Sequence, residues 1–129
     1  MGCSMVGEQT TYSAVLGVVL SNLRQEIGLD QKLMADRMGL SQASYSRLEG
    51  GKSAFSVDQV YQAGEALGLD GQQITMRLNN TVSSLRSNGI QVVPQIRGNT
   101  TQAKQEPSAG VIIAGAALGA LLIGLLSKK

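Results

Sequence analysis

The sequence predicts an all-α protein in which five helices form one domain and a linker leads to a single apolar helix. Three observations carry this prediction. Apolar residues recur at the three- and four-residue spacing of helices over much of residues 11–87. Capping residues such as Ser56 and Asp70 begin periodic segments, and glycines end them. Towards the end of the chain, residues 109–126 include no charged and no strongly polar residue.

Length and composition are those of one small domain with extensions. The chain has 129 residues, of which 3% are aromatic, so its core must be aliphatic and rich in methionine. The formal net charge is +2, yet residues 10–70 carry five basic and seven acidic residues, a balance of −2. That balance argues against general binding of polyanions. Cys3 is the only cysteine, which excludes an intrachain disulfide.

The first segments are a flexible N-terminus and a long helix. Residues 1–9 are predicted to be the flexible lead, and a helix is expected over residues 11–27. Gly28 ends this helix. Its apolar stripe consists of Val15, Leu16, Val19, Leu20, Leu23 and Ile27.

The stretch at residues 31–50 predicts two short helices joined by a tight turn. Small or apolar residues recur on their inward sides: Met34, Ala35, Met38, Leu40, Tyr45 and Leu48. Gly39 stands where the turn needs a positive φ. The hydroxyl of Ser41 can accept a hydrogen bond from the backbone N–H of Ser44 and so cap the second helix. This is a helix-turn-helix pattern.

Two further helices follow. Ser56 and Gln59 form a capping-box pattern at the start of the first, and Gly68 ends it. Asp70 and Gln73 repeat the capping pattern before an additional helix over residues 71–88. One narrow stripe marks this last helix: Ile74, Leu78, Val82 and Leu85. The stripe fits either docking on the domain or a seam between two subunits.

These motifs resemble the Cro/cI-type helix-turn-helix family of phage repressors, also called the XRE family, over residues 16–69. The matching positions are Leu23-Arg24, Gly28-Leu29-Asp30-Gln31, Met34-Ala35, Met38-Gly39-Leu40-Ser41, Gln42, Ser46-Arg47-Leu48-Glu49-Gly50-Gly51-Lys52 and Ala66-Leu67-Gly68-Leu69. Two positions depart from the family pattern, because Asp30 replaces a usual Thr or Ser and Phe55 replaces a usual Pro. The resemblance implies a lambda-repressor-like DNA-binding domain at residues 10–70, of bacterial or phage type.

The second helix of the motif is expected to read base edges in the major groove of double-stranded DNA. Its outward residues are Gln42, Ala43, Ser44, Ser46 and Arg47. The Gln42 amide can pair with adenine, and the Ala43 methyl can contact thymine. Arg47 can pair with guanine or bind a phosphate. Ser44 and Ser46 are small donors with little selectivity.

Three residues are candidate contacts to DNA phosphates. The resemblance implies that Gln31 caps the first motif helix and donates to a phosphate, whereas the alternative is an ordinary surface glutamine. Arg24 and Lys52 are candidates of the same kind, with solvated charges as their alternatives. Glu49 would be repelled by DNA, so we expect it to pair internally with Arg24 or Arg37.

The end of the chain predicts a linker and a membrane anchor. Residues 89–108 are the linker, although residues 90–96 could form a short strand. Residues 109–126 would span about 27 Å as a helix, close to the thickness of a bilayer. We therefore expect a single transmembrane helix with a short tail at residues 127–129. Two basic residues flank it on each side, so charge does not set the orientation. Because a DNA-binding domain must face the cytoplasm, we expect a single-pass protein of the cytoplasmic membrane with that domain on the cytoplasmic side.

Small residues in the predicted anchor could let two copies pack in the membrane. These residues are Gly115, Ala116, Gly119, Ala120 and Gly124. Self-association there and ordinary small-residue content are about equally expected.

Two classes of function follow. The first is a membrane-anchored, sequence-specific DNA-binding regulator that binds a two-fold operator as a homodimer. The second is a membrane adaptor, similar to the bacterial shape protein RodZ, that uses its helix-turn-helix domain to contact a membrane or cytoskeletal protein. The negative charge of residues 10–70 favours the adaptor, and the intact set of outward residues favours the regulator. Without histidine or a phosphate-binding loop, the sequence predicts no enzyme, cofactor or metal site.

Overall fold

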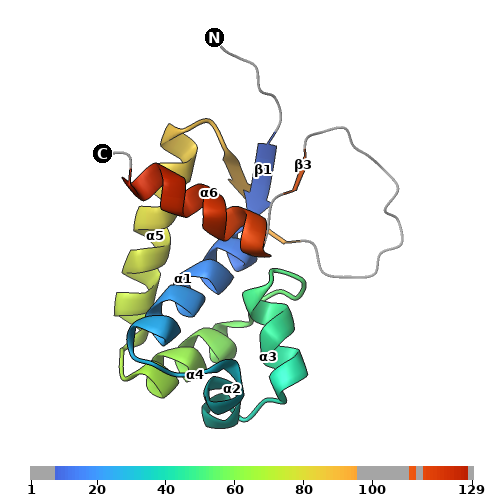
Figure 1. The fold of residues 1–129 in the computed structure, drawn as a ribbon, viewed down its shortest axis with the longest axis vertical. Helices are drawn as coiled ribbons and strands as arrows, with labels where there is room; N and C mark the ends of the chain where they lie inside the picture. Colours follow the sequence, from blue (N-terminus) through green and yellow to red (C-terminus); the bar gives the residue numbers. More distant parts are fainter. Residues whose placement is uncertain (1–7, 96–110, 113–114, 128–129) are drawn as a thin grey trace.

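A computed structural model describes residues 8–95, 111–112 and 115–127 of the chain (Figure 1). The helices are α1 (Tyr12–Glu26), α2 (Gln31–Met38), α3 (Gln42–Glu49), α4 (Val57–Leu67), α5 (Gly71–Ser87) and α6 (Gly115–Ser127). The strands are β1 (Glu8–Thr11), β2 (Gln91–Val93) and β3 (Val111–Ile112). The five helices predicted for the domain are confirmed, with ends that differ by one residue at most.

The helix boundaries follow the capping residues of the sequence. Gly39 has a φ of 76°, and the Ser41 hydroxyl accepts a hydrogen bond from the Ser44 N–H at 3.1 Å. Both capping boxes are present, at the starts of α4 and α5. These local hydrogen bonds satisfy backbone groups that each helix end leaves without a partner in the helix. They explain why the boundaries are visible in the sequence.

A small parallel sheet contradicts the all-α prediction. Strand order is β2-β1-β3, and β1 runs parallel to both neighbours. Gln9 pairs with Gln91 on one side and with Ile112 on the other. Residues 8 and 9 therefore belong to a strand and not to the predicted flexible N-terminus. Residues 91–93 form β2, which confirms the alternative of a short strand within residues 90–96. Strands this short carry too few residues for an alternating pattern, and their partners lie far away in the sequence.

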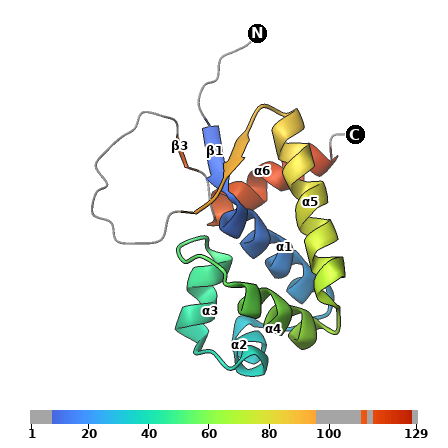
Figure 2. The same cartoon turned by 180° about the vertical axis from the view of Figure 1, so that it is seen from behind.

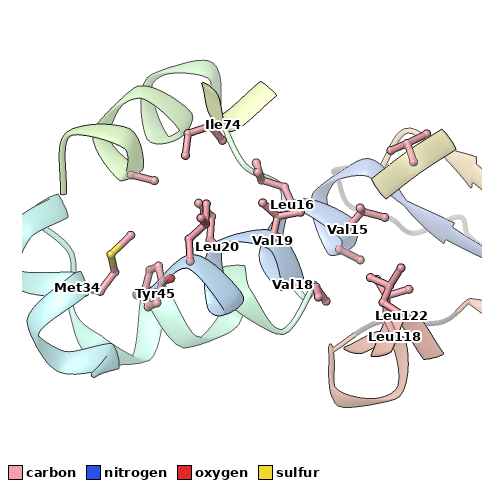
Figure 3. Close-up of a cluster of buried hydrophobic side chains, with 14 of the residues drawn as sticks. Val15, Leu16, Val18, Val19, Leu20, Met34, Tyr45, Ile74, Leu118 and Leu122 are labelled. Carbon is pink, nitrogen blue, oxygen red and sulfur yellow. The ribbon is translucent and has the colours of Figure 1, made fainter. Parts of the chain in front are cut away.

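Helix α1 lies at the centre of the molecule, between α3, α5, α6 and the sheet (Figures 1 and 2). Every residue from 14 to 20 is buried, so this half of α1 has no solvent-facing side. The predicted stripe is confirmed except at Ile27, whose side chain is 54% exposed beyond the end of the helix. Figure 3 shows the core that α1 forms with Met34, Tyr45 and Ile74 from the surrounding helices.

Helix α5 docks on its own domain. Ile74, Val82 and Leu85 are buried, and Leu78 packs against the same core from its edge. The helix contacts α1 and α4. The apolar stripe therefore packs within the chain, as the docking alternative expects.

The apolar segment near the end of the chain differs from the predicted continuous helix over residues 109–126. Val111–Ile112 pair with β1, and α6 begins only at Gly115. Within the described ranges, we find no helix with the length and apolarity needed to cross a bilayer. Leu118 and Leu122 instead join the core on the side of α1 that carries Val15 and Val18 (Figure 3). Burial of each leucine stabilises this position by roughly 1.5–3 kcal/mol.

The small residues predicted to pack in the membrane lie against different parts of the molecule. Gly115 lies against the backbone of Gly50, at the end of α3. Gly119 and Ala120 line an open groove beside α1. The structure does not describe the surroundings of Ala116 and Gly124.

Candidate nucleic-acid interface

Helices α2 and α3 form the predicted helix-turn-helix. The Asp30 carboxylate accepts a hydrogen bond from the Leu33 N–H at 2.8 Å and is the N-cap of α2. The prediction that Gln31 caps this helix is therefore wrong, since Gln31 is its first helical residue. Asp at the cap preserves the function of the usual Thr or Ser, because all three side chains offer an acceptor oxygen.

One side of α3 faces the core and the other faces solvent. Tyr45 and Leu48 are buried under α1 and α2. The five residues predicted to contact bases are all exposed: Gln42, Ala43, Ser44, Ser46 and Arg47. The Ser44 Oγ accepts a hydrogen bond from the Ser41 Oγ at 3.1 Å, so its oxygen takes part in the cap of α3. The other four side chains are presented to solvent by one rigid helix.

A buried carboxylate holds α3 in place. Glu49 is 8% exposed, and its Oε2 lies 2.7 Å from Nε of Arg24. Arg24 Nη2 donates to Glu49 Oε1 at 3.2 Å, and Nη1 donates to the carbonyl of Leu29 at 2.8 Å. Two hydrogen bonds from one guanidinium fix both the distance and the angle of the pair. Glu49 pairs internally as predicted, with Arg24 as its partner.

Arg24 lies on the inside of the motif and not on the polar side of α1, and its contact with a phosphate stays a prediction. Its side chain is 11% exposed and donates hydrogen bonds to Glu49 and to the carbonyl of Leu29. Hydrogen bonding to Glu49 raises the pKa of Arg24 above its ordinary value, despite the opposing effect of burial. Arg37, the other predicted partner of Glu49, donates instead to the carbonyl of Ala66 at 2.8 Å near the end of α4.

Two more side chains complete the network around Glu49. The Tyr45 hydroxyl donates to Oε2 at 2.6 Å, and the Gln31 amide donates to Oε1 at 2.9 Å. Burial, followed in effect by the hydrogen bond to Glu49, raises the pKa of Tyr45 far above its ordinary value. A buried carboxylate with this many donors has the compensation that its desolvation requires. Sequence reasoning missed Tyr45 in this role, although its spacing of four residues from Glu49 on one helix was available.

The remaining phosphate candidates lie around α3. Gln31 is partly exposed at the start of α2, where the bond to Glu49 orients its amide. An amide nitrogen has two N–H groups, so Gln31 can hold Glu49 and still donate a second bond. Lys52 is exposed in the loop after α3, and its backbone N–H donates to the carbonyl of Arg47 at 2.9 Å. Contact of either residue with a phosphate stays a prediction.

The described residues bring no metal-binding cluster together. Within those ranges, no group of three or more His, Cys, Asp or Glu residues could hold an ion. Gln31, the exposed residues of α3 and Lys52 together offer amides, hydroxyls, a methyl group and the two cations Arg47 and Lys52. Such groups bind the edges of bases and the oxygens of phosphates without a cofactor.

Comparisons with known proteins agree with this geometry. Residues 15–75 match the model of a helix-turn-helix domain family. Two crystal structures of the clp gene regulator ClgR from Corynebacterium glutamicum are similar to the chain. One has 21% identity over 54% of this chain and 91% of that chain, with a TM-score of 0.52. The other has 19% identity over 60% of this chain and 82% of that chain, with a TM-score of 0.57.

A point mutant of the restriction-modification controller protein C.Esp1396I is similar too. It has 15% identity over 56% of this chain and 94% of that chain, with a TM-score of 0.54. Comparison with curated proteins gives no match. At these identities the structural similarities show a shared fold, and they agree with the family match in the helical part of the chain.

Proposed function

We propose, from the XRE-like helix-turn-helix domain at residues 15–75, that this protein is a sequence-specific DNA-binding transcriptional regulator. In this proposal α3 enters the major groove of double-stranded DNA, and two copies bind a two-fold operator. The segment at residues 109–126 attaches the protein to the cytoplasmic membrane, with the helix-turn-helix domain in the cytoplasm.

The observation that carries the proposal is the exposed side of α3. Gln42 and Arg47 combine exposure with side chains that pair bidentately with adenine and guanine. The network of Glu49 fixes the helix that presents them by joining α1, α2 and α3 through side chains. A pre-formed reading helix supports recognition because little conformational entropy is lost on binding.

The dimer and the membrane attachment rest on separate arguments. An α3 of eight residues reaches only a few base pairs, so two copies one DNA turn apart are needed for a specific operator. Membrane attachment is supported by the uncharged composition of residues 109–126, which a bilayer would cover completely.

The adaptor is the alternative function. It is favoured by the net charge of −2 over residues 10–70, since a protein partner does not require a basic surface. In that case α3 would contact a membrane or cytoskeletal protein, and no DNA sequence would be selected.

The deciding experiment is selection of duplexes from a randomised library by the full chain. We expect an enriched two-fold motif, and we expect Gln42→Ala and Arg47→Ala each to weaken binding to it by about 1–3 kcal/mol. Gln62→Ala and Arg77→Ala are the matched controls, because these residues are exposed on α4 and α5 and not on α3. Absence of any enriched motif would contradict the regulator and favour the adaptor.

A further inference from the structure

Helix α6 is an apolar helix that packs on α1. Leu118 and Leu122 are 0% and 3% exposed, and both belong to the core cluster. Immediately before α6, β3 pairs with β1, so Val111 and Ile112 are tied to residues 8 and 9. The docked position of this segment therefore has two parts, a helix packed on α1 and a strand at the edge of the sheet.

The composition of α6 suits a fully apolar environment better than a protein surface. Residues 115–126 include no polar side chain, whereas a surface helix normally has a polar side towards water. Ile123 lies on the side away from the core and is 67% exposed. Docking on α1 thus buries one side of α6 and leaves apolar surface in water. A bilayer would cover all sides of the same helix.

The docked helix also borders the candidate DNA-binding surface. An open groove of about 490 Å³ runs between α1, α3 and α6. Gln31 and Ser46 line one side, and Gly119, Ala120 and Ile123 line the other. Ser21, Asn22 and Gln25 of α1 lie between them. The wall formed by α6 has no side-chain donor for a phosphate. Asn22 and Gln25 are exposed to water, so what α6 can limit is the approach of a bulky DNA strand to them.

We propose that α6 exchanges between its site on α1 and a lipid bilayer, and that its departure opens this groove to the DNA backbone. The DNA part rests on the proposed function, whereas the exchange itself does not. In the docked state α6 limits contact between a phosphate strand and α1. In the bilayer-bound state β3 leaves β1, and a DNA strand can approach the amides and hydroxyls beside Gln31 and Ser46 without meeting α6.

A lipid surface is the occupant that the observations favour. The uncharged stretch of residues 109–126 is about 27 Å long as a helix, which matches a bilayer core. The structure divides the same stretch between β3 and α6. Since one stretch cannot pair with β1 and span a bilayer at the same time, docking and insertion must compete. A second copy of the chain is tested as a competing occupant below.

Amide hydrogen exchange, measured by mass spectrometry on the full chain, tests whether α6 moves from α1 to the bilayer. The probe is a suspension of vesicles made from phosphatidylglycerol and phosphatidylcholine in equal parts. We expect vesicles to increase the protection of α6 and, in the same sample, to decrease the protection of β1, which loses β3. Binding of vesicles with unchanged protection of β1 would overturn the proposal, and so would absence of vesicle binding.

Two variants separate docking from lipid affinity. Leu118→Ala and Ile123→Ala each remove apolar surface from α6, but only Leu118 faces α1. We expect β1 to lose its protection at about tenfold lower lipid concentration in Leu118→Ala than in Ile123→Ala. The reason is that a large-to-small substitution in the core destabilises the docked state. Equal lipid requirements would contradict a docked state that competes with the bilayer. If β1 loses its protection when protein concentration alone is raised, without lipid, then α6 leaves α1 to bind a second copy of the chain.

Binding of the selected duplex with and without vesicles tests the groove. We expect the full chain to bind DNA several-fold more tightly when vesicles hold α6. If the affinity for the duplex is the same with and without vesicles while β1 has lost its protection, the proposal that the groove opens to DNA is wrong. If no duplex is selected at all, the regulator proposal fails. The hydrogen-exchange experiment still decides whether α6 moves between α1 and the bilayer.

Discussion

The Glu49 carboxylate, in the interior of the motif, accepts hydrogen bonds from Arg24, Tyr45 and Gln31. These residues belong to α1, α3 and α2, so one side chain connects the three helices that set the direction of α3. Removing one partner leaves a buried group without compensation, which costs more than the bond contributed. The stability of the network therefore depends on protonation of its members.

Tyr45 makes this dependence measurable. Its raised pKa means that the folded state keeps the phenol protonated where the unfolded state ionises, so the stabilisation is complete below about pH 10 and is lost as pH rises beyond it. We expect Tyr45→Phe to lower the free energy of unfolding by about 1–3 kcal/mol at neutral pH. Above about pH 10 the variant should lose stability less steeply than wild type.

Chemical denaturation at pH values from neutral to alkaline checks the Tyr45 prediction. Tyr61→Phe is the control, because Tyr61 is 58% exposed and lies outside the network. Parallel pH profiles for wild type and Tyr45→Phe would show that the hydroxyl does not stabilise the fold through Glu49.

Among single residues, the sequence predicted both the exposed side of α3 and the internal pairing of Glu49, but not the burial of Arg24. Gln42 and Arg47 are exposed as predicted, because Tyr45 and Leu48 mark the inward side of α3 by their spacing. Arg24 was misplaced because a charged residue at the end of an amphipathic helix normally faces solvent. The approach of α3 to α1 shows that Arg24, and not Arg37, is the partner of Glu49 and that it is buried.

Among the helices, α1 and α3 come close together at Gly17, where a side chain is absent. A Cβ atom at Gly17 would lie 2.5 Å from the backbone oxygen of Glu49 and 2.7 Å from that of Leu48. These distances are too short for a carbon, and the atoms belong to backbone that cannot turn away. Gly17 therefore allows the close contact between α1 and the end of α3.

We expect Gly17→Ala to lower the free energy of unfolding by about 1–3 kcal/mol, although alanine is the better helix former. Gly119→Ala is the matched control, since it lies in a helix with nothing within 4 Å of the added Cβ. The control should be neutral or more stable by up to about 1 kcal/mol. Thermal and denaturant unfolding measure both variants. Unchanged stability of Gly17→Ala would contradict the close contact.

Elements with local signals were predictable, whereas of the three strands only β2 was anticipated, as a short strand within residues 90–96. The helices α1 to α5 are marked by caps and by spacing within a few residues of one another. The strands have two to four residues and are paired across most of the chain length. For α6, hydrophobicity alone predicted burial, and it could not distinguish burial against α1 from burial in lipid.

At the scale of the whole molecule, charge limits how DNA can be bound. With a net charge of −2 over residues 10–70, affinity must come from the few cations near α3. If Arg47 and Lys52 each neutralise one phosphate, the slope of log K against log salt is about −2 per protomer.

Titration of the selected duplex at several salt concentrations measures this slope. We expect Lys52→Gln to reduce it by about 1 per protomer and to weaken binding to all sequences alike. Arg77→Gln, at an exposed position on α5, should leave the slope unchanged. A wild-type slope steeper than about −6 per protomer would place phosphate contacts well beyond α3 and its loop.

The central claim is that α3 reads base edges, and Gln42 tests it most directly. Wild type and Gln42→Ala are titrated with the selected duplex and with duplexes in which each base pair of a half-site is replaced in turn. We expect wild type to discriminate at one A·T pair by about 1–3 kcal/mol and Gln42→Ala to lose discrimination at that pair while keeping it at the other positions. Full discrimination by Gln42→Ala at every position would contradict a reading role for this side of α3.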